Sequence, residues 1–397
     1  MSKTRPKFQA ESIIKTWPMV RLGDVCEDTI QRIKSISEPR IAYIDIASID
    51  NVQKRVIGVK EHDVDDAPGR AQQVVIPGDV LVSNVRPNLN AVAIVDAASA
   101  VPLIASTGFC VLRVKDMVLP KYVYYYAQTS DFIDPLVAVS EKASYPSVTD
   151  AIVKDSLIPL PSLSEQKEIV ARLERELAAV EKMKKGFEAL AETARAEFKA
   201  ELKEVFEDSI YALEPLSKYC SFTGGSQPPK SSFIYEPKDG YVRLYQIRDY
   251  NGDPKPTYIK ASDAKKTSRR GDIMIGRYGA SIGLVFWAED GAYNVAMVKV
   301  LINSSAILPE FVFEALHTPR IQSVFRSASR NAQAGFNESE WNKMKLPVPP
   351  LSAQREVVSR LDSAKARAEK LEAKAREGVA ACETMRKAIL KEAFESE

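Results

Sequence analysis

The stretch I-P-L-P-S-L-S-E-Q-K-E-I-V-A-R-L at Ile158–Leu173 decides the organisation of this chain, because it recurs as L-P-V-P-P-L-S-A-Q-R-E-V-V-S-R-L at Leu346–Leu361. The correspondence continues without a gap over residues 156–208 and 344–396, at a constant spacing of 188 residues. Self-similarity over this length indicates two copies of one structural unit. The order along the chain is therefore globular, helical, globular, helical.

Each copy of the repeated stretch begins a long predicted helix. Ser164 or Ser352 is placed to cap it, and no proline follows in either segment. Apolar residues then recur at the a and d positions of a heptad, which is the pattern of a coiled coil. The predicted seam residues are Ile169, Leu173, Val180, Met183, Phe187, Leu190, Val357, Leu361, Leu371 and Met385.

The length of these helices favours pairing between them. At 1.5 Å per residue each would be roughly 65 Å long, which exceeds the diameter of a small domain. Because a globular region follows the first helix and leads into the second, we expect the two to run antiparallel. The alternative is that each helix packs on its own globular region, as surface helices commonly do.

The regions before the two helices carry short β-branched runs bounded by Gly, Pro, Asn and Asp, which predict strands. We therefore predict an α+β fold in which two β-rich domains alternate with two long helices, and the helices pair as an antiparallel coiled coil in a pseudo-two-fold internal repeat. The predicted domains are 1–155 and 211–345, and the predicted helical segments are 156–210 and 346–397.

Composition argues against a catalytic chain. The 397 residues carry a net charge of +2, with four cysteines that form no C-x-x-C pair and two histidines. A zinc site, a disulfide framework or a general base has few residues to draw on, and no phosphate-loop or nucleophile-elbow motif is present. The polar start of the chain and the absence of a long apolar run predict a cytoplasmic protein.

Basic and amide side chains single out two loops and one basic cluster. Residues 211–345 carry 18 basic and 13 acidic side chains, so the second globular region is the electropositive one. Arginine and asparagine suit base edges, whereas lysine and hydroxyl groups suit phosphates. Candidates for base contact are Asn84, Arg86, Asn88, Asn90, Arg277, Tyr278, Arg330 and Asn331, and candidates for phosphate contact are Lys142, Lys265, Lys266, Ser268, Arg269 and Arg270. The alternative reading is an ordinary solvated surface, with the asparagines capping turns.

The chain resembles the specificity (S) subunit of type I restriction-modification systems. The resemblance covers nearly the whole chain and rests on the two helix-start motifs, on G-D-V-L-V-S-N-V-R-P at Gly78–Pro87, on A-S-T-G-F-C-V-L-R-V at Ala105–Val114 and on G-D-I-M-I-G-R-Y-G-A-S-I-G at Gly271–Gly283. Ala353 departs from the usual glutamate of the motif.

The resemblance implies a non-catalytic reader of double-stranded DNA. Each globular domain would be a target recognition domain for one half of a bipartite asymmetric site, and the helix pair would set the spacer. Two methyltransferase subunits would bring S-adenosylmethionine, two motor-nuclease subunits would bring ATP and Mg²⁺, and this chain would hold no cofactor or metal and contact no membrane. The alternative is a coiled-coil scaffold that joins two proteins without binding nucleic acid.

Overall fold

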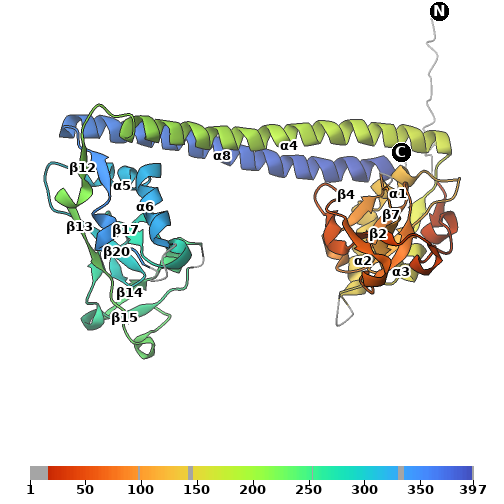
Figure 1. Ribbon diagram of the computed structural model, residues 1–397, viewed down its shortest axis with the longest axis horizontal. Coiled ribbons are helices and arrows are strands. Elements are labelled where there is room, and N and C mark those ends of the chain that lie inside the picture. The colour runs from red at the N-terminus through yellow and green to blue at the C-terminus, as the bar shows by residue number, and fades with distance from the viewer. Residues whose placement is uncertain (1–16, 97–98, 142–145, 253, 330–334, 396–397) are drawn as a thin grey trace, which may run out of the picture. The chain divides into compact units, whose positions relative to one another are not determined.

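The computed structural model describes residues 17–96, 99–141, 146–252, 254–329 and 335–395. Figure 1 shows long helices and globular parts that mix strands with shorter helices. The chain divides into two compact units, Met1–Gly186 with Glu377–Glu397, and Phe187–Arg376. No helix among the described residues is both long and apolar enough to span a membrane. Each unit is described below by itself.

The first unit is built on two mixed sheets that share one core. The five-stranded sheet has the order β10-β7-β8-β4-β3 and the four-stranded sheet the order β5-β2-β9-β6. A two-stranded ribbon of β1 and β11 leads into the first long helix. The strands are β1 (Met19–Arg21), β2 (Arg40–Ile44), β3 (Ile49–Asp50), β4 (Arg55–Val56), β5 (Lys60–Asp63), β6 (Ala71–Val75), β7 (Val80–Ser83), β8 (Val92–Ile94), β9 (Leu103–Ser106), β10 (Phe109–Leu112) and β11 (Leu157–Pro159).

The second unit repeats this plan with shorter sheets. The four-stranded sheets have the orders β13-β20-β17-β18 and β15-β14-β19-β16, and β12 pairs with β21 as the ribbon. The strands are β12 (Leu213–Pro215), β13 (Cys220–Gly224), β14 (Tyr241–Tyr245), β15 (Tyr258–Lys260), β16 (Thr267–Ser268), β17 (Ile273–Gly276), β18 (Val285–Trp287), β19 (Gly291–Tyr293), β20 (Met297–Ile302) and β21 (Lys345–Pro347).

Three short helices follow the sheets in each unit. They are α1 (Pro120–Tyr126), α2 (Ser130–Ser140) and α3 (Asp150–Asp155) in the first unit, and α5 (Pro309–Leu316), α6 (Pro319–Ser329) and α7 (Glu338–Trp341) in the second. A proline occupies the first position of α1 and of α5, where its missing N–H costs nothing. The predicted alternation of β-rich domains with long helices is confirmed.

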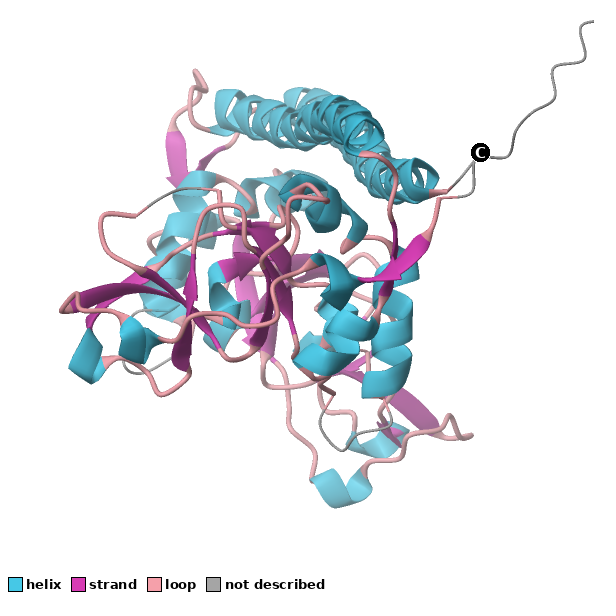
Figure 2. Cartoon of the chain, turned by 90° about the vertical axis from the view of Figure 1, so that its right-hand side faces the viewer, coloured by secondary structure: helices cyan, strands magenta, loops and turns pink. Residues whose placement is uncertain are grey.

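The long helices α4 (Leu163–Phe206) and α8 (Leu351–Phe394) lie side by side (Figure 2). They run antiparallel, because Lys184 pairs with Glu383 at 3.3 Å while Arg195, further along α4, pairs with Glu372 at 3.2 Å. The predicted antiparallel pairing is therefore confirmed. Each helix also packs on a globular core at both of its ends, so the alternative packing contributes as well.

The seam of the helix pair corrects the heptad prediction at two positions. Leu173 and Leu361 are fully buried, but Met183 and Met385 are 43% and 45% exposed. The side chain of the neighbouring Lys184 is only 17% exposed. In this stretch the ion pair of Lys184 with Glu383 makes the contact between the helices, so a strictly apolar heptad does not describe it.

The helix start is also shifted from the prediction. Ser162, and not Ser164, caps α4: its hydroxyl accepts from the Glu165 N–H at 3.4 Å, and the Glu165 carboxylate accepts from the Ser162 N–H at 3.0 Å. This reciprocal arrangement is a capping box. Ser164 lies within the first turn of the helix and is exposed.

A buried glutamine joins each long helix to its globular part. Gln166 accepts from the Leu119 N–H at 2.8 Å and donates to the carbonyls of Met117 and Pro161. Gln354 repeats this in the second unit, accepting from the Leu308 N–H at 2.8 Å and donating to two carbonyls there. Both side chains are 0% exposed. This glutamine latch fixes the start of the short helix α1 or α5 against the long helix, which is why the motif repeats a glutamine.

Candidate nucleic-acid interface

The predicted base-reading loop of the first unit connects β7 to β8. Its first asparagine, Asn84, is 8% exposed and donates from Nδ2 to Asp150 Oδ1 at 2.6 Å. The carbonyl of Asn84 accepts from the Val148 N–H at 2.9 Å. Asn84 therefore holds the loop against the start of α3, and its side chain is occupied inside the fold.

The middle of this loop is available to a ligand. Arg86 and Asn88 are exposed. Arg86 directly precedes the short turn Pro87–Leu89 and Asn88 lies within it, so both stand on a short rigid stretch. Arg86 has a φ of 50°, a left-handed conformation that costs a non-glycine residue about 1 kcal/mol or more. Such strain is stored at functional positions more often than elsewhere.

The last asparagine of the loop turns toward the long helices. Asn90 is half-buried, also left-handed with a φ of 45°, and donates from Nδ2 to the Gln128 carbonyl at 3.2 Å. Its carbonyl accepts a hydrogen bond from Lys54 Nζ. Of the four predicted base-contact residues in this loop, the structure leaves Arg86 and Asn88 projecting and engages Asn84 and Asn90 internally.

The loop between β17 and β18 is its counterpart in the second unit. Tyr278 is 40% exposed, and the Arg277 guanidinium lies 5.1 Å from its ring centre. Arg277 Nε donates to the Phe336 carbonyl at 3.3 Å. Arg277 is half-buried, and Tyr278 is the more exposed of the two.

The same backbone hydrogen bond anchors both loops. The Asn84 carbonyl accepts from the Val148 N–H at 2.9 Å, and the Arg277 carbonyl accepts from the Phe336 N–H at 3.0 Å. In each unit the donor immediately precedes the residue that caps the third short helix, Thr149 for α3 and Asn337 for α7. The two loops therefore occupy equivalent places in the two copies of the fold.

The predicted phosphate cluster is only partly exposed to solvent. Lys265, Lys266 and Arg269 are exposed, with Lys266 Nζ donating to Thr223 Oγ1 at 2.8 Å. Ser268 is 5% exposed and its hydroxyl donates to the Glu289 carbonyl. Arg270 forms an ion pair with Glu289 at 2.8 Å. The four cations of the cluster are therefore exposed, with Arg270 in a surface ion pair and Lys266 in a hydrogen bond, whereas Ser268 is buried.

Three predicted contact residues, Lys142, Arg330 and Asn331, lie outside the described residues. Within the described ranges, no group of three His, Cys, Asp or Glu side chains is placed to hold a metal ion. Burial raises the pKa of Cys26 to about 11 and that of Cys220 to about 12. Both thiols therefore stay protonated at neutral pH and are poor nucleophiles.

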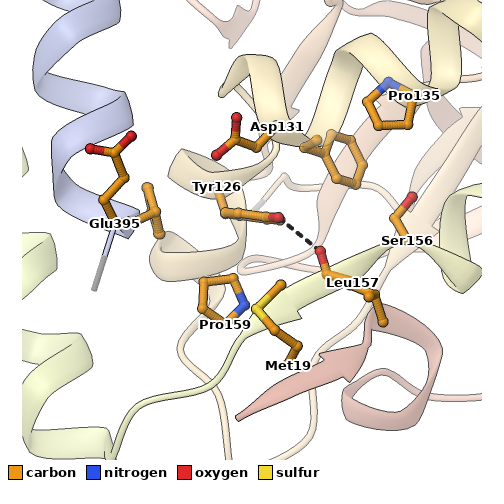
Figure 3. Close-up of a pocket in the computed structure, with 10 residues that line it drawn as sticks. Met19, Tyr126, Asp131, Pro135, Ser156, Leu157, Pro159 and Glu395 are labelled. Carbon is orange, nitrogen blue, oxygen red and sulfur yellow. Dashed lines mark hydrogen bonds between the residues drawn. The ribbon is translucent and has the colours of Figure 1, made fainter. Parts of the chain in front are cut away.

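A cleft of about 720 Å³ lies in the first unit where the end of α8 meets α1, α2 and the β1–β11 ribbon (Figure 3). Tyr126 and Leu157 close its floor through a hydrogen bond of 2.8 Å from the phenol to the carbonyl. Its lining includes two carboxylates, Asp131 and Glu395, and no basic side chain. The cleft is thus acidic and apolar, unlike the loops, and does not suit a nucleic acid.

Sequence reasoning missed two cations that meet near Asn90. Lys54, at the turn between β3 and β4, and Arg386, on α8, both line a second cavity of the first unit. Neither belongs to a basic run, and they are more than 300 residues apart, so no local pattern could have joined them.

Known proteins share both the sequence pattern and the fold. The family model described as "Type I restriction modification DNA specificity domain" matches residues 14–187 and 219–379. The EcoBI specificity subunit of Escherichia coli is 23% identical over 75% of this chain and 69% of its own length, and the EcoKI specificity subunit of E. coli K12 is 21% identical over 83% and 76%.

Solved structures agree with the sequence relatives. A chain from a study of complex assembly and conformational transition of the type I R-M system superposes with a TM-score of 0.83 at 27% identity, covering 96% of this chain and 98% of that one. The HsdS subunit from Thermoanaerobacter tengcongensis gives a TM-score of 0.60 at 27% identity, covering 97% and 98%. The family match spans both copies of the repeat, and the chain belongs to the type I restriction-modification DNA specificity family.

Proposed function

We propose that this chain is the DNA-reading specificity subunit of a type I restriction-modification complex. One observation carries the proposal beyond family membership: two equivalent loops, each anchored by the same backbone hydrogen bond, present an arginine in both copies of the fold. Arginine pairs with guanine by two hydrogen bonds in the major groove. Two such readers in one chain suit a site made of two different half-sequences.

The residues that we propose for base contact come from the two equivalent loops and from the sequence prediction. They are Arg86 and Asn88 for one half-site and Arg277 with Tyr278 for the other, together with Arg330 and Asn331 from the sequence prediction. Lys265, Lys266, Arg269 and Arg270 are exposed cations that we propose for phosphate contact, and Lys142, outside the described residues, is proposed from the sequence alone. We assign Asn84, Asn90 and Ser268 to support of the fold, because their side chains donate hydrogen bonds to groups inside it.

The antiparallel helix pair is proposed to set the spacing between half-sites. Both helices are 44 residues long, and each is latched by its glutamine to one globular part. Adding or removing helical turns in both helices together would change the separation of the two readers without changing either loop. The boundaries 1–155, 156–210, 211–345 and 346–397 describe this division of roles.

Catalysis is assigned to partner subunits. We propose that two methyltransferase subunits supply S-adenosylmethionine, and that motor-nuclease subunits supply ATP and Mg²⁺ chemistry. Specificity subunits of this family are non-catalytic parts of the complex. A role at the cellular DNA accords with the cytoplasmic location expected from the sequence.

The test is to map methylated sites after single changes in the assembled methyltransferase. Arg86→Ala should relax one position of one half-site and Arg277→Ala one position of the other, since losing a two-bond arginine contact removes about 1–3 kcal/mol of discrimination. The matched control is Arg175→Ala, an exposed arginine on α4 away from both loops. Relaxation of both half-sites by either change would contradict separate readers.

The family match does not favour the scaffold alternative, and one measurement distinguishes that alternative from the DNA-reading role. Affinity for duplex DNA should fall steeply with salt, because each phosphate contact releases counterions, with a slope of about 0.9 per contact. An interface with another protein alone would give no duplex binding to measure.

A further inference from the structure

A second cavity of the first unit, of about 280 Å³, lies between the globular part and the long helices. It is lined by the β3–β4 turn, by Asn90 at the end of the β7–β8 loop, by Gln128 two residues after α1, and by both long helices. The side chains that define it are Lys54, Asn90, Gln128, Cys382, Arg386 and Lys387. We call it the junction cavity.

The charge in the junction cavity is unbalanced. Its two carboxylates, Glu181 and Glu383, pair with Lys185 at 3.8 Å and Lys184 at 3.3 Å. No described carboxylate forms an ion pair with the other cations of the lining, which are Lys54, Arg386 and Lys387. The cavity therefore has an excess of positive charge.

The hydrogen bonds of the two inner cations go to neutral groups. Lys54 Nζ donates to the Asn90 carbonyl, and Arg386 donates to Gln128 Oε1 at 2.6 Å. Both acceptors orient the cations without cancelling their charge. Charges taken out of water without an anion are costly, and proteins retain few of them outside binding sites.

Two further features of the cavity are unfavourable without an anion beside its cations. Lys54 and Asn90 both have left-handed backbones, with φ values of 56° and 45°. Desolvation, reinforced by the charge of Arg386, lowers the pKa of Lys54 to about 8 although Asp50 opposes the shift. An anion in the cavity would offset the charge of Lys54 and of Arg386 together.

The equivalent place in the second unit carries aromatic side chains. The residues that correspond to Tyr124, Gln128 and Arg386 are Phe313, His317 and Phe198. Phe313 stacks on Trp287 with ring centres 4.2 Å apart and contacts His317 at 4.8 Å. Aromatic contacts thus replace the polar arrangement around Gln128 and Arg386, with Lys365 Nζ 5.8 Å from the Phe313 ring centre.

We propose that the junction cavity of the first unit binds a phosphate group of the DNA backbone next to the half-site read by the β7–β8 loop. The inference rests on the proposed function and names a contact outside the base-reading residues. The cavity is continuous with that loop, since Asn90 lines it and lies four positions after Arg86. A phosphate on Lys54 and Arg386 would fix the register of the duplex without reading sequence.

The test uses the full chain with its methyltransferase partner and variants Lys54→Met, Arg386→Met and the double variant. The control is Lys182→Met, an exposed lysine of α4 outside the cavity lining. Binding of a cognate duplex is measured across a salt series. The double variant should reduce the salt slope by about one, the value for one lost phosphate contact, and weaken specific and nonspecific duplexes alike, while methylated sites keep their sequence.

A second arm uses inorganic phosphate and the full chain without DNA, read by thermal shift. Phosphate that stabilises the wild type and not the double variant, together with an unchanged DNA salt slope, would overturn the DNA backbone as the source and leave a free phosphate ligand. No effect in either arm would overturn the phosphate site altogether. Lys54→Arg with Arg386→Lys keeps both charges and should restore the slope, which excludes misfolding as the cause of a loss.

Failure of the proposed DNA-reading function can be distinguished from failure of the phosphate site. A wild-type complex that binds no duplex would contradict the proposed DNA-reading role, whereas the thermal-shift arm would still report on phosphate in the cavity.

Discussion

The two units close the contact between globular part and helix pair with different chemistry. In the first unit, Tyr124 and Gln128 of the globular part meet Arg386 of α8 in a polar arrangement around a cavity. In the second, Phe313 stacks on Trp287, and the ring of His317 lies tilted against it. Both arrangements sit on the same latch, helix and ribbon.

This difference teaches which parts of the repeat are constrained. The glutamine latch is the same in both units, atom for atom, because it satisfies backbone groups that every copy of the fold must bury. Side chains beside the latch vary, because several combinations fill the space equally well. The loops vary most, since they face outward.

The largest expected effect is on the latch itself. Gln166→Leu should destabilise the first unit, and Gln354→Leu the second, by about 3–4 kcal/mol each. Each change removes three hydrogen bonds and leaves a buried N–H and two carbonyls unpaired. Hydrogen exchange of the amides in each unit would measure the loss, with the exposed Lys167→Leu as control.

If the two units are held by equivalent latches, each change should loosen mainly its own unit. Equal loss of protection in both units after either change would show that the helix pair couples them into one cooperative structure. It would contradict the view that each latch stabilises mainly its own unit.

The next effect distinguishes the two junctions. Phe313→Ala should cost about 3 kcal/mol, because the ring is 6% exposed and its removal leaves a void beside Trp287. Tyr124→Phe removes only the hydrogen bond from the phenol to the Lys54 carbonyl, 2.9 Å long, and should cost about 1 kcal/mol. Chemical denaturation of each variant gives both numbers. A larger cost for Tyr124→Phe than for Phe313→Ala would reverse the assignment of polar and apolar junctions.

The smallest effect is the pH dependence of Lys54→Met. The folded pKa of Lys54 is lowered to about 8, mainly by desolvation, whereas an unfolded lysine titrates near 10.4. Between these values the unfolded state binds more protons, so stability rises with pH across that window and the buried charge is unfavourable below it. Lys54→Met should therefore be more stable than wild type at pH 7 by about 1 kcal/mol in phosphate-free buffer.

That advantage should shrink toward pH 10, where the lysine is neutral in the folded state. Thermal unfolding at pH 7, 8.5 and 10 would show the trend, with Lys182→Met as the control that stays level. A wild type more stable than Lys54→Met at pH 7 would mean that Lys54 has an anionic partner within the protein.

Much of the architecture could be predicted from the sequence because it depends on periodicity. The repeat at Leu163 and Leu351 located both long helices, and the apolar spacing indicated that they pair. Met183 and Met385 are the exceptions: the ion pair of Lys184 with Glu383 makes the contact in that stretch, and a pattern of apolar spacing does not predict such a pair.

The candidate site was predicted in kind but not in detail. The loops were located because a Gly-Asp strand and an arginine recur in both copies. Which asparagine projects and which is engaged depends on Asp150 and Gln128, residues that approach only when the chain folds. The same holds for Arg270, whose partner Glu289 lies on the far side of a hairpin.

The sequence by itself determined the repeat, the helix pair and the division into two β-rich parts, because each follows from residue spacing along the chain. Only the tertiary structure decided what occupies the junctions and which polar side chains remain free. Lys54 and Arg386 meet in one cavity through contacts between segments that are distant in sequence. The spacing of residues along a chain does not predict such long-range contacts, since burial and charge pairing depend on which surfaces the fold brings together.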